Sequence, residues 1–213
     1  MDKKEKFSSF SVPLGLLDYI NPIFYSITMI TVIRNTYSSM GRPFNVLLLI
    51  GAIISIFFGF IIPTGKVIVG LGIIKFRMPV SLVFCVNAGI LISGLMLLKY
   101  VMDMSTAAIS ILITAIVALL MLIYTKSRKI NSIAVLTGAA GYLLIYTSLI
   151  TLSVRTGIRI PVIMYAAAIM LFVMLCGIGI KADLKDPKVH WVIEISNVVC
   201  QGLVAAATVL LFS

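Results

Sequence analysis

The sequence predicts an all-α membrane protein, folded as a compact bundle of about seven transmembrane helices in a single domain, 1–213. Three observations predict this class. Only 11% of the residues are charged and 61% are hydrophobic, whereas a soluble domain carries about 25% charged residues. Seven acidic residues are too few to wet the surface of a soluble chain of this length, so lipid has to cover most of it. Apolar runs near the roughly 20 residues that a bilayer requires recur along the chain.

Short segments with Pro, Gly or charge separate these runs. The expected spans lie near 13–34, 44–63, 79–98, 105–124, 132–154, 160–180 and 190–212. In the first span, Asp18, Asn21 and Pro22 interrupt the apolar pattern, so we expect a broken helix, or an interfacial segment followed by a short crossing. The stretch from Pro63 to Lys66 is expected to be a loop.

The basic residues orient the bundle. Twelve of the 17 lie on the side of the amino terminus and five on the other, which by the positive-inside rule predicts a cytoplasmic amino terminus and an external carboxyl terminus. We expect the cytoplasmic membrane of a bacterium. Short basic segments between apolar runs meet lipid headgroups, so the bilayer rather than nucleic acid is the expected partner. The twelve are Lys3, Lys4, Lys6, Lys66, Lys75, Arg77, Lys126, Arg128, Lys129, Lys181, Lys185 and Lys188; the five are Arg34, Arg42, Lys99, Arg155 and Arg159.

Two blocks of the chain are distantly alike and predict a parallel 3+1+3 repeat, with the fourth span as linker. Each block holds two arginines, two prolines and a central asparagine. These are Arg34, Arg42, Pro43, Pro79 and Asn87, and then Arg155, Arg159, Pro161, Pro187 and Asn197. The layout resembles that of SWEET-type sugar transporters. The Pro-Gln dipeptide of the related PQ-loop proteins is absent and the inferred orientation is opposite, so the resemblance covers layout alone.

The last span carries a polar stripe. At about 100° per residue, His190, Glu194, Asn197 and Gln201 fall within an arc of roughly 60°. Glu194 is the acidic residue placed inside a clearly apolar span, where a charge is costly unless it is paired, solvated or neutralised. The stripe therefore predicts a binding site for a small solute or ion.

Other polar residues are expected at a similar depth on the cytoplasmic side. Asp18 and Asn21 begin the first span, and Asn87 lies in the third. If these helices touch, they form a pocket open to the cytoplasm, which Tyr142, Tyr146 and Ser153 of the fifth span would extend outward. The predicted substrate- or ion-binding residues are Glu194, His190, Asn197, Gln201, Asn87, Asp18 and Asn21.

Plainer roles stand beside this hypothesis. His190 and Trp191 suit an anchor at the headgroup level. The amides at Asn87, Asn197 and Gln201 suit hydrogen bonds between helices. Glu194 is near enough to the helix start to reach water.

The numbers of histidines and cysteines and the absence of known catalytic motifs disfavour several enzyme classes. One histidine cannot build a multi-histidine metal site or a bis-histidine haem, and no HExxH, GxSxG, P-loop or GxGxxG motif is present. Cys85, Cys176 and Cys200 lie far apart in apolar runs and form no CxxC motif. We therefore expect no metal and no cofactor.

Small residues form two ridges that allow close helix approach. One runs through Gly51, Ser55 and Gly59, and the other through Gly202 and Ala206. Each serves either packing within the chain or a homo-oligomer interface.

The function expected from these features is a membrane transporter or channel-like protein for a small solute or ion. One alternative is an intramembrane enzyme acting on a lipid or isoprenoid substrate through His190 and Glu194, which the sequence favours less. Another is a non-catalytic scaffold, sensor or immunity protein.

Overall fold

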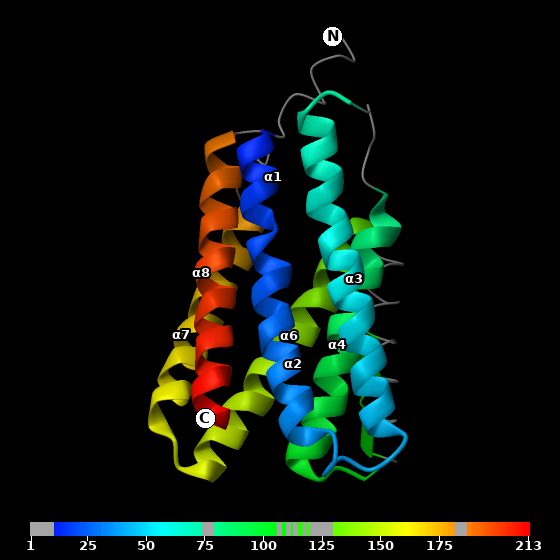
Figure 1. Cartoon of the computed structure of the whole chain (residues 1–213), viewed down its shortest axis with the longest axis vertical. Helices are drawn as coiled ribbons and strands as arrows, with labels where there is room; N and C mark the ends of the chain where they lie inside the picture. Colours follow the sequence, from blue (N-terminus) through cyan, green and yellow to red (C-terminus); the bar gives the residue numbers. More distant parts are fainter. Residues whose placement is uncertain are drawn as a thin grey trace.

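The computed structural model describes residues 11–73, 79–105, 130–181 and 187–213, with a few single residues between 108 and 119. In this part of the chain the secondary structure is helical, without strands, as the sequence predicts (Figure 1). The helices are α1 (Val12–Asp18), α2 (Ile20–Thr36), α3 (Phe44–Gly70), α4 (Val80–Met102), α6 (Ile130–Thr156), α7 (Arg159–Lys181) and α8 (Pro187–Phe212).

The described residues give six long helical segments, counting α1 and α2 as one, where the sequence predicts seven. Five are long and apolar enough to cross a membrane, and the shorter apolar helix Arg159–Leu175 lies within α7. The predicted fourth span, 105–124, falls largely outside the described residues. The structure is that of a multi-pass membrane protein. The predicted repeat is not confirmed.

The first segment is a broken helix, as predicted. Pro22 has no backbone N–H, so the carbonyl of Asp18, four residues earlier, loses its usual helical donor. The helix is interrupted there, with α1 ending at Asp18 and α2 starting at Ile20. Both pieces together make one apolar span, Val12–Thr36.

The predicted loop from Pro63 to Lys66 is wrong. α3 continues through Pro63 to Gly70. Proline is tolerated inside membrane helices because neighbouring side chains and local adjustments satisfy the backbone. The hydroxyl of Thr64 donates to the carbonyl of Phe60 at 2.7 Å and lies 2.7 Å from the hydroxyl of Tyr19.

The helices pack around the bundle in chain order. α3 contacts α4, α4 contacts α6, α6 contacts α7 and α7 contacts α8, while α1 and α2 join α8 to α3 (Figure 1). Glycines permit the closest approaches: a Cβ at Gly141 of α6 would lie 2.6 Å from the backbone nitrogen of Leu91 in α4. A Cβ at Gly51 of α3 would lie 2.8 Å from the carbonyl oxygen of Gly89 in α4. The ridge at Gly51 is thus used within the chain.

The outward faces are apolar. Ile163 and Met170 of α7 are 69% and 70% exposed, and exposed isoleucine, leucine, valine and phenylalanine side chains occur on the other long helices. Buried aromatic, aliphatic and small polar side chains fill the interior, including Tyr146 and Tyr165. This pattern suits a surface in contact with lipid tails.

Candidate functional site

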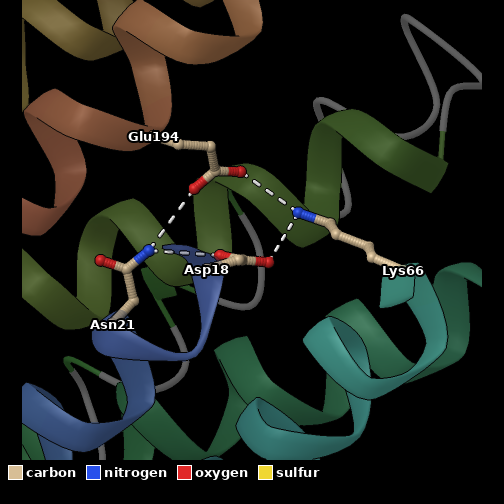
Figure 2. Close-up of polar contacts among 4 residues, drawn as sticks. All are labelled: Asp18, Asn21, Lys66 and Glu194. Atoms are coloured by element: carbon tan, nitrogen blue, oxygen red, sulfur yellow. Dashed lines mark hydrogen bonds and ion pairs between the residues drawn. The ribbon is translucent and has the colours of Figure 1, made fainter. Parts of the chain in front are cut away.

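Four polar side chains from three separate stretches of the chain meet near one end of the bundle. Asp18 comes from α1, Asn21 from α2, Lys66 from α3 and Glu194 from α8 (Figure 2). We call these four residues the ionic cluster. It lies beside the end of α3 and the start of α8, about 10 Å inside the start of α8 at 1.5 Å per residue.

The Lys66 ammonium stands between two carboxylates. Its Nζ lies 2.6 Å from Oδ2 of Asp18 and 3.2 Å from Oε1 of Glu194. The Asn21 amide joins the same two carboxylates from the other side, donating through Nδ2 to Oδ1 of Asp18 at 3.2 Å and to Oε2 of Glu194 at 3.4 Å. The four side chains thus close a ring of charge-assisted contacts (Figure 2).

Local structure brings these groups together. The interruption after Asp18 starts a new helical turn at Ile20, which places Asn21 next to Asp18. Gly15, one turn before Asp18, packs on α3 so closely that a Cβ there would lie 2.9 Å from Cγ2 of Val67 and 3.4 Å from Cβ of Lys66. Because Gly15 has no side chain, α1 lies close enough to α3 for Lys66 to reach Asp18.

The cluster is mostly withdrawn from solvent but not sealed. The Lys66 side chain is 19% exposed and those of Asp18 and Glu194 are each 13% exposed. With both carboxylates and Lys66 ionised, these three groups carry a formal charge of −1. Charges in such surroundings are stable only when they are paired and hydrogen-bonded. In that ionisation state the two carboxylates outnumber the Lys66 ammonium by one.

A cavity of about 120 Å³ adjoins the cluster. Its lining comes from α1, α2, α3, α4 and α6 and combines polar groups with aromatic and aliphatic ones. The lining residues are Asp18, Asn21, Pro22, Tyr25, Ser55, Gly59, Ile62, Val86, Ile90 and Tyr142. Asp18 and Asn21 belong to both the cluster and the cavity, so the charged ring and the cavity form one continuous site.

Three of the seven residues predicted to bind a solute or ion meet in the ionic cluster: Asp18, Asn21 and Glu194. Asn87 lies elsewhere, with its Nδ2 donating to the carbonyl of Ala134 in α6 at 2.7 Å. Gln201 is buried and donates to the hydroxyl of Tyr146 at 3.3 Å. Asn87 and Gln201 therefore join helices to one another, which is the plainer role considered for them.

The remaining two predicted residues lie on α8 near Glu194. His190 precedes Glu194 by one turn and is half-buried, and Asn197 follows it and is also half-buried. Trp191 is 36% exposed, as suits a ring at the membrane surface. Of the sequence-predicted additions from the fifth span, Tyr142 lines the cavity.

Lys66 is the site residue that sequence reasoning missed. Its place after Pro63, Thr64 and Gly65 is typical of a loop, and its charge is typical of a topology determinant. The apolar run that resumes at Val67 is the signal that could have found it, because a lysine flanked by apolar residues on both sides falls inside a helix rather than at its end.

Within the described residues, no group of three or more His, Cys, Asp or Glu side chains gathers that could hold a metal ion. Comparisons of the chain with protein-family models, with curated proteins and with solved structures give no match.

Proposed function

We propose that this protein is a transporter for a small solute or ion in the cytoplasmic membrane of a bacterium, with the ionic cluster as its ion site. One observation carries the proposal: a lysine ammonium bridges two carboxylates inside an apolar bundle, beside a polar cavity. Charged side chains within membrane spans are costly and mark ion and substrate pathways.

The cluster has the chemistry of a competitive cation site. Lys66 acts as a tethered cation that neutralises Asp18 and Glu194 when no other cation is present. A proton or a small cation that binds to Glu194 weakens the hold of that carboxylate on Lys66, so the ammonium turns toward Asp18 or toward water. Binding thereby favours one of two arrangements of α1, α3 and α8, which is what alternating access requires.

An enzymatic role for Glu194 is less favoured by the geometry. Oε1 contacts Lys66 and Oε2 accepts from Asn21, so both oxygens already have partners inside the cluster. A general acid or base needs an oxygen within reach of the substrate proton.

The proposed topology has seven crossings. α4 and α6 run parallel, because Asn87 near the start of α4 bonds Ala134 near the start of α6, and Arg155 near the end of α6 donates to the carbonyl of Val101 near the end of α4. Two parallel helices need a connection that returns across the membrane, and 105–124 supplies it in this proposal. The amino terminus and the ionic cluster then face the cytoplasm and the carboxyl terminus faces outside, since moving Lys66 into a helix leaves the basic bias intact.

Proton flux into proteoliposomes tests the function. Vesicles containing the purified chain and a trapped pH-sensitive dye receive an imposed pH gradient, with the membrane potential clamped by potassium and valinomycin. We expect faster dissipation than in protein-free vesicles, and we expect Glu194→Gln to slow it strongly while leaving a rate measurably above the protein-free one.

Asp103→Asn is the matched control for that experiment. Asp103 is an exposed carboxylate outside the cluster with φ of 50°, a left-handed conformation that asparagine adopts readily. Wild-type flux in Asp103→Asn is expected. Flux in wild-type vesicles no greater than in protein-free ones, or full flux in Glu194→Gln, would refute the transport role of the cluster.

A further inference from the structure

The lining of the 120 Å³ cavity includes a buried hydrogen-bond acceptor that has no donor, Oδ1 of Asn21. The Ser55 hydroxyl donates its hydrogen to the carbonyl of Gly51 at 2.7 Å and accepts from the Tyr25 hydroxyl at 3.5 Å, which leaves one lone pair of its oxygen for a further donor. The Asn21 amide donates to both carboxylates, and its own Oδ1 is buried with no hydrogen-bond partner. A buried polar atom without a partner is uncommon and costs free energy until something bonds it.

Two prolines add backbone acceptors at the same place. Pro22 has no N–H for the carbonyl of Asp18, and Pro63 has none for the carbonyl of Gly59, four residues earlier in each helix. Asp18 and Gly59 both line the cavity. Each proline therefore removes the usual helical donor from the carbonyl of a cavity-lining residue, and in the binding inferred below a ligand with N–H groups supplies a donor in its place.

The charge of the cluster and the size of the cavity restrict the class of ligand further. When both carboxylates are ionised, they outnumber the Lys66 ammonium by one negative charge, which a ligand with a single positive charge would balance. An apolar cavity of about 150 Å³ holds benzene, so the smaller volume here suits a compact molecule of roughly five non-hydrogen atoms or fewer. The rings of Tyr25 and Tyr142 contribute to the lining, and aromatic rings attract cations.

From these observations we propose that the cavity binds a small ammonium-type cation, that is, ammonium or a short primary amine, with its N–H groups donated to Asp18, Oδ1 of Asn21 and Ser55. Such a ligand presents the same group as Lys66, so it competes with the lysine for the Asp18 carboxylate. The inference rests on the proposed transport function and names its substrate class.

Direct binding tests this inference separately from transport. The full chain in detergent micelles is titrated with radiolabelled methylammonium at constant pH and ionic strength. Saturable binding is expected, and unlabelled methylammonium should displace the label. Tetramethylammonium has the same charge but is bulkier and has no N–H donors, so it should fail to compete at equal concentration.

Variants locate the binding. Val86→Phe fills the cavity from α4 without replacing any residue of the ionic cluster and should abolish binding. Val199→Phe is the matched control, because Val199 is 48% exposed on the outer face of α8. Ser55→Ala removes one acceptor and should weaken binding roughly five- to tenfold, the effect of losing one hydrogen bond.

The outcomes separate this inference from the proposed function. Absence of saturable methylammonium binding, equal competition by tetramethylammonium, or unchanged binding in a folded Val86→Phe chain overturns the ammonium site. The competition experiment uses the wild-type protein, so it tests the ammonium site even if a variant does not fold. Proton flux that depends on Glu194 without methylammonium binding leaves transport standing and removes this ligand class. Methylammonium binding without any proton flux leaves the ammonium site standing and removes the transport function.

Discussion

At the scale of single residues, Lys66 determines whether the cluster is stable. Two carboxylates face its ammonium, and the only other group that joins both of them in the cluster is the neutral amide of Asn21. Removing one partner of a buried ion pair is far more destabilising than removing the whole pair, because the remaining charge has lost its compensation.

Lys66→Met should therefore lower the free energy of unfolding by about 2–3 kcal/mol, less than for a fully buried pair because the side chains keep some exposure. Adding Glu194→Gln to Lys66→Met should recover part of this loss. The measurement is unfolding of the purified chain by titration with a denaturing detergent.

Lys99→Met is the control for the lysine substitution. Lys99 lies 4.1 Å from the centre of the Phe44 ring and contacts no cluster residue in the described structure, so its loss should lower the free energy by about 0.5–1 kcal/mol. Equal losses for Lys66→Met and Lys99→Met, or further destabilisation by the added Glu194→Gln, would show that Lys66 does not compensate the carboxylates.

The sequence made Asp18, Asn21 and Glu194 predictable because each is polar among apolar neighbours. Their meeting was not predictable, since it depends on Gly15 bringing α1 onto α3 and on contacts between residues far apart in the chain. Asn87 and Gln201 look the same in sequence as members of the site. Only the structure shows that their hydrogen-bond partners are Ala134 and Tyr146 on other helices.

At the scale of the helices, the prolines decide where sequence reasoning succeeds. Pro22 interrupts the first span as predicted, because it has no N–H to donate to the carbonyl of Asp18. Pro63 does not end α3. Each proline removes one backbone hydrogen bond from its helix, so local sequence alone does not distinguish a break from a continuous helix. The packing around each proline makes that distinction.

The parallel packing of α4 and α6 leads to a prediction about topology. With a returning span at 105–124, a reporter fused after Ser213 should lie outside the cell, giving high alkaline phosphatase activity and no fluorescence from green fluorescent protein. A fusion truncated after Gly72, following two crossings, should give the opposite result. Cytoplasmic signals from both fusions would contradict the seven-span topology.

At the scale of the whole molecule, few charges and a high mean hydropathy of +1.18 predicted an all-helical membrane bundle, which the described residues confirm. The apolar periodicity of the spans could not show which helices are neighbours, because the face of a span toward lipid and its face toward other helices are both apolar. The structure supplies that order: α1 and α2 connect α8 to α3, and this closure is what brings Asp18, Lys66 and Glu194 together.

The central claim is that Asp18 and Glu194 act as one site. Proton flux in proteoliposomes, measured for Asp18→Asn, Glu194→Gln and the double variant, tests it most directly, because residues that act as a unit give non-additive losses. We predict that each single variant slows flux and that the double variant is no slower than the slower single one. Wild-type flux in either single variant, or losses that multiply in the double variant, would contradict the claim.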